Sequence, residues 1–215
     1  MDAIRQVGER FFAGTPPTRE LLRVTDVLRG VGAIDTTWYT EAGRDRGTAV
    51  HEAVALDCEG ALDTDVVRAH YPDIASRLEA WWAFKALPGL RVLAWEHRVV
   101  DLARGYTGRW DLLLEHPKLR YPAIVDLKCY KALPWVRLQL AAYVRASHKL
   151  EGIDGQPLDV TVEFPVLERA SLSLLDDGTF RFDPLPRADG PGDERVFLSM
   201  LETEQWKRTH QPTRA

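Results

Sequence analysis

Residues 122–129 read Pro-Ala-Ile-Val-Asp-Leu-Lys-Cys, a short apolar run interrupted by one acid and one base. The proline at its start and the β-branched residues after it favour a strand. Because successive side chains of a strand point to opposite faces, Asp126 and Lys128 share one face. Burying both charges is unfavourable unless they bind a ligand or each other. Taken alone, the two residues are better explained by a structural ion pair than by catalysis.

The elements on either side of this strand follow from the period of the apolar residues. Residues 91–102 and 106–115 are expected to form a hairpin that turns near 103–105. Pro134 then begins a helix of about 15 residues. Other helices are expected over 25–30, 40–57, 72–87 and 192–209, and other strands at 158–166 and around a turn at 176–178. The order of helices, three strands, helix, strands and helix predicts an α/β (α+β) fold.

The composition indicates one folded domain. The 215 residues are 45% apolar and 28% charged, with no internal repeat. We expect a helical N-terminal part over 1–43, a motif-bearing core over about 44–166, and C-terminal strands and a helix over 167–215. No stretch approaches the roughly 18 apolar residues of a membrane span, and the first residues do not form a signal peptide. We therefore expect a soluble intracellular protein without a membrane partner.

Charge and cysteine content exclude several function classes. The formal net charge of −4 argues against a protein that coats DNA. The stretch 126–150 holds five basic residues against one acid, which fits a local patch for phosphate or a solvated helix face. The two cysteines, Cys58 and Cys129, are too few for a disulfide framework or a four-thiolate metal site.

A second acid lies in the strand before the 122–129 run. Asp111 interrupts the apolar run of residues 110–114, just after Gly108. If the two strands are antiparallel neighbours, Asp111 and Asp126 can share a cation, because paired carboxylates repel unless a divalent ion offsets them. On its own, Asp111 also fits a solubilising charge on an edge strand.

Two helices contribute further candidates. His51 follows Gly47 by one helical turn, and the missing side chain leaves room for a ligand beside the imidazole. Gln139 and Tyr143 are spaced i, i+4 on the helix after Lys128, so they project from one face. Taken singly, these residues also fit ordinary surface or packing positions.

The order of these residues resembles a known family. Four short motifs occur in sequence order on the expected elements: GxxxH (Gly47 to His51) in a helix, GxxD (Gly108 to Asp111) and DxK (Asp126 to Lys128) in strands, and QxxxY (Gln139 to Tyr143) in a helix. Over about residues 44–145 they resemble the RecB-like exonuclease branch of the PD-(D/E)XK nuclease superfamily. This resemblance implies a central mixed sheet flanked by helices, in the order α-β-β-β-α-β.

The short chain is also similar to stand-alone members of phage type. With two cysteines it cannot hold the four-cysteine iron–sulfur cluster of some RecB-like nucleases. The third-motif acid is Asp126 where many superfamily members have glutamate, although the RecB-like branch also uses aspartate. The resemblance implies a location in the cytoplasm of a bacterium or a phage-infected host.

The resemblance also implies roles for particular residues. His51, Asp111, Asp126 and the carbonyl of Leu127 would bind Mg²⁺ or Mn²⁺, and Lys128 would act on the attacking water and the transition state. Glu96 is an additional acidic candidate. Gln139 and Tyr143 would contact the DNA backbone or brace the site. The basic residues expected along the DNA path are Arg44, Arg46, Lys131 and Arg137.

The sequence thus predicts a metal-dependent deoxyribonuclease, an exonuclease that hydrolyses phosphodiester bonds in single- or double-stranded DNA. One alternative is a nuclease-like module that binds DNA or a partner without turnover, although all four motifs are intact. Another is a small-molecule phosphohydrolase that uses the same cation. The oligomeric state, the polarity and the strand preference stay open at this stage.

Overall fold

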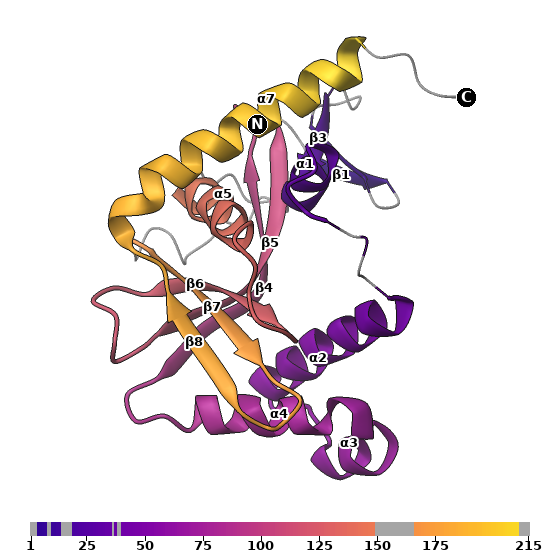
Figure 1. The fold of residues 1–215 in the computed structure, drawn as a ribbon, viewed down its shortest axis with the longest axis vertical. Coiled ribbons are helices and arrows are strands. Elements are labelled where there is room, and N and C mark those ends of the chain that lie inside the picture. Colours follow the sequence, from indigo (N-terminus) through magenta and orange to yellow (C-terminus); the bar gives the residue numbers. More distant parts are fainter. Residues whose placement is uncertain are drawn as a thin grey trace.

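A mixed sheet of eight strands forms the centre of the molecule (Figure 1). The computed structural model describes residues 4–7, 10–13, 19–35, 37, 40–148 and 166–210. The strands lie in the order β1-β2-β3-β5-β6-β7-β8, and β4 pairs with β5. The pairs β3–β5 and β6–β7 are parallel and the others antiparallel. The bounds are β1 Ile4–Val7, β2 Arg10–Ala13, β3 Arg19–Arg23, β4 Arg91–Asp101, β5 Tyr106–Glu115, β6 Ala123–Lys128, β7 Glu168–Leu174 and β8 Phe180–Pro184.

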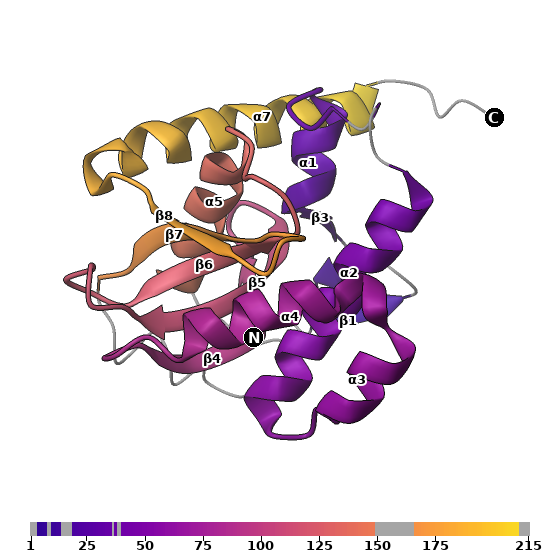
Figure 2. The ribbon, with the colours of Figure 1, turned by 60° about the horizontal axis from the view of Figure 1, so that its bottom comes forward.

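Helices cover both faces of this sheet. Figure 2 shows α5 and α7 on one side and α2 and α4 on the other. The alternation of the strands feeds both layers: on β5, Leu113 packs toward the α5 layer, whereas Leu112 and Leu114 pack toward the α2 and α4 layer. The helices are α1 Val24–Gly30, α2 Glu41–Glu59, α3 Thr64–His70, α4 Pro72–Lys85, α5 Val136–His148 and α7 Gly190–His210, with a 3-10 turn at Arg187–Asp189.

Local sequence explains where α2 and α4 begin and end. The hydroxyl of Thr40 accepts a hydrogen bond from the amide of Gly43 at 3.1 Å, which caps α2. Gly60 ends α2 in the left-handed region at φ +72°, where glycine is least strained. Pro72 occupies the first turn of α4, where no amide hydrogen is needed. The boundaries of the helix that carries His51 are therefore set by its own residues.

The expected α/β fold with a central mixed sheet flanked by helices is confirmed. The hairpin expected around 176–178 joins β7 to β8, and Gly178 adopts φ +79° in its turn. The helix α3 was not expected, although Asp63 caps it by accepting hydrogen bonds from Asp65 and Val66. The strand expected at 158–166 lies almost entirely outside the described residues.

The N-terminal part differs from the helical segment expected over 1–43. It begins with β1, β2 and β3, and helix starts only at Val24. The reason is tertiary: β3 pairs in parallel with β5, and the amide of Leu22 donates a hydrogen bond to the carbonyl of Gly105 at 3.1 Å. The sheet thus satisfies backbone groups that a helix would otherwise have satisfied. Among the described residues, no helix has the length and apolar character needed to cross a membrane.

Candidate functional site

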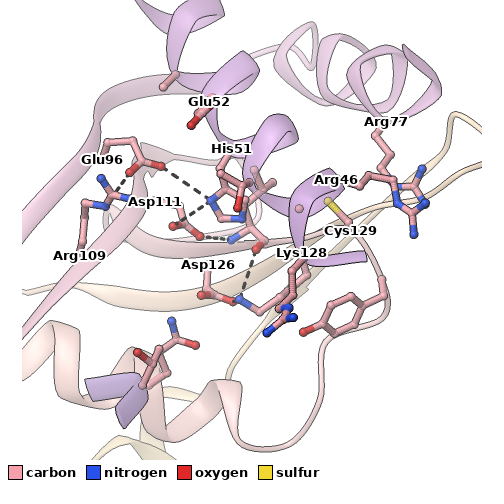
Figure 3. Close-up of a pocket in the computed structure, with 18 of the residues that line it drawn as sticks. Arg46, His51, Glu52, Arg77, Glu96, Arg109, Asp111, Asp126, Lys128 and Cys129 are labelled. Carbon is pink, nitrogen blue, oxygen red and sulfur yellow. Dashed lines mark hydrogen bonds and ion pairs between the residues drawn. The ribbon is translucent and has the colours of Figure 1, made fainter. Parts of the chain in front are cut away.

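A pocket of about 1470 Å³ collects most of the residues singled out from the sequence. Both helix layers contribute to it: α2 from one side of the sheet, α5 from the other, and the strands β4, β5 and β6 between them (Figure 3). Its lining includes Arg44, Arg46, Gly47, His51, Glu96, Gly108, Asp111, Asp126, Leu127, Lys128, Gln139 and Tyr143.

An imidazole and two carboxylates meet at the centre of this pocket. His51 Nδ1 lies 3.3 Å from Asp111 Oδ1 and 3.8 Å from Glu96 Oε1. Figure 3 shows both acids directed at the histidine. One ligand atom from each residue lies within 4.8 Å of the others, so the three can hold a metal ion together. Among the residues that the structure describes, no other group of three or more potential metal ligands lies this close together.

Glu96 enters the site through an irregularity of β4. The register of β4 against β5 shifts between Val92 and Ala94, and beyond this bulge Glu96 and Asp111 lie between the register pairs Trp95–Leu112 and His97–Trp110. Like charges directly opposite on neighbouring strands are destabilising. Glu96 also has φ +49°, a conformation that is strained for a residue with a side chain. Strain and like-charge contact at one residue are typical of a functional position.

Asp111 connects the histidine to β6. Its Oδ2 atom accepts a hydrogen bond from the amide of Leu127 at 2.6 Å, while Oδ1 faces His51. Burial opposes protonation of His51, but the charge of Asp111 and the contacts with both acids outweigh it and raise the pKa of His51 to about 10. Burial also favours the neutral form of Asp111, yet His51, Lys128 and the Leu127 amide lower its pKa. Without a cation, the imidazolium therefore stabilises the acids.

Asp126 and Lys128 form a second pair beside this cluster. Lys128 Nζ lies 2.6 Å from Asp126 Oδ2, and it donates a hydrogen bond to the carbonyl of Leu127 at 3.3 Å. Asp126 is 1% exposed, and burial together with the charge of Asp111 raises its pKa to about 6 against the opposing effects of Lys128 and His51. The ammonium group also lies 5.3 Å from the centre of the Trp135 ring. The strand period thus placed both charges on one face, as expected.

The GxxD and QxxxY motifs are one packed unit. A Cβ atom on Gly108 would lie 2.3 Å from Cε1 of Tyr143, so the glycine allows the ring to rest against β5. The side-chain amide of Gln139 donates a hydrogen bond to the Tyr143 hydroxyl at 2.8 Å. Both side chains are buried, and burial raises the pKa of Tyr143. They brace the pocket wall next to Asp126 and Asp111.

Gly47 has a different role from Gly108. A Cβ atom added to Gly47 would meet nothing within 4 Å, so packing does not require a glycine there. The residue lines the pocket one turn before His51. This is compatible with the expected open space beside the imidazole.

The expected basic residues separate into two groups. Arg44 and Arg46, on the first turns of α2, line the pocket. Lys131 is exposed and is not part of the lining. Arg137 points elsewhere: its guanidinium lies 2.7 Å from Asp189 and 3.3 Å from Asp193, which join α5 to the start of α7. Arg137 is therefore outside the pocket lining, and its position along a DNA path stays a prediction.

Sequence reasoning missed four arginines of the pocket: Arg23, Arg77, Arg98 and Arg109. Arg98 on β4 lies opposite Arg109 on β5, and Arg23 comes from the end of β3. Arg109 Nε lies 2.9 Å from Glu96 Oε2, and Arg23 Nε lies 2.6 Å from an oxygen of Asp26. Partial burial and the neighbouring charges of Arg109 and Arg23 lower the pKa of Arg98. Residues 96–98 and 109–111 each hold one acid and one arginine two positions apart. The sequence does not show which of these residues lie across from one another; the strand register does.

The donor set of the central cluster fits a hard divalent cation. Carboxylate oxygens are the ligands that Mg²⁺ and Mn²⁺ prefer, and an imidazole nitrogen suits Mn²⁺ better than Mg²⁺. The opposed pair Glu96 and Asp111 supplies two negative charges that a cation would offset. The residues present therefore fit such an ion, whereas thiolate ligands are absent from the pocket's central cluster.

Comparisons with known proteins add a remote structural likeness. No family model matches the chain, and no curated protein matches it. The chain is similar to an alkaline exonuclease (LHK-Exo) from Laribacter hongkongensis, with 13% identity and a TM-score of 0.33 over 88% of this chain and 92% of that chain. The structure of LHK-Exo in complex with dAMP is similar with 14% identity and a TM-score of 0.31 over the same shares.

Proposed function

We propose that the chain is a single-domain, divalent-metal-dependent nuclease that hydrolyses phosphodiester bonds in DNA. The observation that supports this activity is the opposed acid pair Glu96 and Asp111 at His51, with the ion pair of Asp126 and Lys128 alongside. Two acids that share a cation next to a lysine provide what phosphodiester hydrolysis needs: a place for positive charge and a donor for the phosphate. The motif resemblance favours an exonuclease among such enzymes.

His51, Glu96 and Asp111 would hold Mg²⁺ or Mn²⁺. The carbonyl of Leu127, which accepts a hydrogen bond from Lys128, is the further ligand that the motif resemblance implies. When bound, such a cation supplies positive charge for a phosphate and lowers the pKa of water. Asp111 stays fixed by its hydrogen bond from the Leu127 amide, so its other oxygen is directed into the cluster. In this arrangement Glu96, and not Asp126 as expected from the sequence, is the second acidic ligand beside His51.

Lys128 would orient a water molecule and stabilise negative charge on the phosphate in the transition state. Its ammonium group has a fixed position because Asp126, the Leu127 carbonyl and the Trp135 ring surround it. A preorganised donor of this kind needs no reorganisation during the reaction. Asp126 would position Lys128 and contribute negative charge to the cation site from the next strand.

Arg44 and Arg46 would contact DNA phosphates at the mouth of the pocket, since both line it from the first turns of α2. Lys131 is an outer contact in this proposal because it is exposed. Gln139 and Tyr143 would brace the site, as they bond to each other. Their burial makes a bracing role a better fit than direct contact with the DNA backbone.

The test is hydrolysis of labelled linear DNA by the purified protein with Mg²⁺ or Mn²⁺. We expect cation-dependent release of nucleotides, and we expect Lys128→Ala to lower the rate by about 10²–10⁴-fold. Lys118→Ala is the matched control because Lys118 is an exposed residue in the turn before β6. Equal rates for Lys128→Ala and the wild type would contradict the proposal.

Circular and nicked DNA, together with small phosphate esters, separate the alternatives. An exonuclease leaves closed circles intact, whereas an endonuclease cuts them. DNA binding without any cation-dependent product would instead indicate a binding module. Cleavage of nucleotides or phosphate esters with no action on DNA would indicate a small-molecule phosphohydrolase.

A further inference from the structure

The ladder between β4 and β5 segregates its charges by sign. On the face that meets the pocket, Glu96 and Asp111 both contact His51 and lie between the register pairs Trp95–Leu112 and His97–Trp110. Two residues further along, Arg98 lies opposite Arg109. A pair of acidic residues is therefore followed by a pair of basic residues, and we call these the acid pair and the arginine pair. Like charges that face each other across a ladder are unfavourable, and both pairs bring like charges together on neighbouring strands.

At the far end of the same ladder, residues of opposite charge face each other. There Arg91 lies opposite Glu115, and the two form an ion pair of 3.1 Å at the protein surface. If Arg98 and Asp111 were exchanged, both site pairs would have this favourable form. The sequence keeps like charges together only where the ladder enters the pocket, which points to ligands of opposite sign at each pair.

The acid pair and the arginine pair are not independent. Arg109 Nε contacts Glu96 Oε2 at 2.9 Å, so a diagonal ion pair joins them. A divalent cation held by Glu96 and Asp111 would supply two positive charges to the two carboxylates. The charge of Arg109 would then lose its compensation by Glu96, and an anion next to the cation would restore it.

We propose that Arg98 and Arg109 form a phosphate-binding subsite beside the cation site, with the phosphoryl oxygens of a polynucleotide as the ligand. This subsite rests on the proposed nuclease function and adds to it the residues that grip the substrate. A guanidinium presents its donors in a planar fork that matches phosphoryl oxygens. The two arginines come from paired strands, so their spacing is fixed by the sheet and not by a loop.

Two sources of phosphate fit this chemistry: an internal phosphodiester and a terminal phosphomonoester. Arg98 is half-buried and the side chain of Arg109 is 58% exposed, so the subsite opens toward solvent from the pocket floor. Tyr143, packed on Gly108 next to Arg109, lines the pocket beside both arginines.

The test measures binding of a labelled short oligonucleotide with a nuclease-resistant backbone in the presence of Mn²⁺, because Arg109 pairs with Glu96 when no cation is bound. Fluorescence anisotropy is recorded against salt concentration for the wild type, Arg98→Gln, the double variant Arg98→Gln/Arg109→Gln and the control Arg91→Gln. We expect the double variant to bind about 10- to 100-fold more weakly. We also expect the slope of log K against log salt to fall by about 1. Arg98→Gln is the cleaner single variant, since Arg109 also contacts Glu96.

The control has the same strands and the same change of charge. Arg91→Gln should bind within about twofold of the wild type, because Arg91 lies at the far end of the ladder. Arg98→Lys should recover part of the lost affinity, since it restores the charge but not the fork. The urea midpoint of Arg98→Gln should equal or exceed that of the wild type, because the change relieves a like-charge contact.

Oligonucleotides with terminal phosphate or terminal hydroxyl distinguish the two sources. Loss of affinity for both indicates an internal phosphodiester, and loss only with the terminal phosphate indicates an end. Wild-type affinity in the double variant, or an equal loss in Arg91→Gln, overturns the subsite. A parallel hydrolysis assay with Mg²⁺ or Mn²⁺ tests the nuclease itself: if the wild type is inactive while binding still depends on Arg98 and Arg109, the activity fails and the subsite stands.

Discussion

The helix α2 carries two polar contacts that are built in opposite ways. Near its end, Asp57 accepts hydrogen bonds from the ring nitrogens of Trp81 at 2.7 Å and Trp82 at 3.0 Å, and it pairs with Lys85 at 2.8 Å. Two turns earlier, His51 meets Asp111 and Glu96, two acids that oppose each other across strands. The first contact is matched by donors on α4. The second gathers like charges.

This difference separates structural polarity from functional polarity. A carboxylate with three donors needs no further ligand, and its loss leaves buried donors without partners. Two acids that share one imidazolium can still gain from a divalent cation, which supplies twice that charge. We therefore expect changes at Asp57 to lower stability, and changes at the pocket to lower activity while stability stays nearly constant.

The largest expected effect is on the rate of hydrolysis. Asp111→Asn should lower the cation-dependent rate by on the order of 10³-fold, because the substitution removes one of the two opposed charges that would hold the cation. Its free energy of unfolding should change by less than ~1 kcal/mol, since the amide oxygen can still accept the hydrogen bond from Leu127. Steady-state rates and urea unfolding measure the two quantities.

Asp65→Asn is the matched control for this change. Asp65 lies on α3 with its side chain 95% exposed, outside the pocket. It should leave both the rate and the unfolding midpoint unaltered. A rate for Asp111→Asn within tenfold of the control would show that the cluster does not hold the catalytic cation.

Cation binding should stabilise the folded protein. At a concentration of about 100 Kd, a ligand that binds only the native state adds about 2.7 kcal/mol. For a chain of this size that corresponds to about 5–10 °C in Tm. Glu96→Gln should reduce the shift produced by Mn²⁺, because it removes one of the two carboxylates that would hold the cation. Differential scanning calorimetry with and without Mn²⁺ compares the two proteins.

The shift should also depend on pH. Without cation, the pKa of His51 is raised to about 10 by Asp111 and Glu96 against the effect of burial, so the imidazole is protonated at neutral pH. A cation that binds His51 must displace this proton. The apparent affinity should therefore increase from pH 6 to pH 9 by up to tenfold per unit, as calorimetric titration would record. An affinity independent of pH would remove His51 from the set of ligands.

The contact at Asp57 should respond in stability and not in rate. Asp57→Ala removes the acceptor of two tryptophan ring nitrogens, one of them on the fully buried Trp81, and should lower the free energy of unfolding by about 2 kcal/mol. Lys85→Ala is the control, since that side chain is 41% exposed, and it should cost less than ~1 kcal/mol. Urea unfolding measures both free energies. A loss of activity in folded Asp57→Ala would contradict the prediction that this contact affects stability and not rate.

Much of the fold could be predicted because its signals are local. The helix from Pro72, the turn at 176–178 and the alternation around Asp126 depend on residues within one element. The first strands could not be predicted, since Arg-Glu-Leu-Leu-Arg in β3 has no clear alternation and becomes a strand by pairing with β5 over Leu22 and Arg23. A contact of that kind has no local signature.

The same distinction applies to the site. The face shared by Asp126 and Lys128 follows from the strand period, so the sequence could place that pair. Glu96 reaches Asp111 only through the bulge in β4, which no periodicity announces. Arg137 looked like part of a basic patch, but its partners come from the chain beyond Asp189. Motif residues were thus easier to place than their partners.

The smallest expected effect is the pH dependence of the Asp57 contact. Burial alone would raise the pKa of Asp57, but the hydrogen bonds from Lys85, Trp81 and Trp82 lower it below the value of about 3.9 in the unfolded chain. The folded state therefore binds fewer protons, and the contribution is fully present above the unfolded pKa. It is lost as the pH falls through the folded pKa.

Asp57→Asn cannot ionise, but its single amide oxygen replaces the two carboxylate oxygens that accept separately from Trp81 and Trp82. Only the part of its effect that changes with pH therefore reports the charge. The difference in unfolding free energy between wild type and Asp57→Asn should be about 1 kcal/mol at pH 7 and should shrink below about pH 4. Urea unfolding at a series of pH values measures it. A difference that stays constant on acidification would mean that Asp57 stabilises α2 and α4 by shape and hydrogen bonding alone, and its charge would then have no more structural role than that of Asp65.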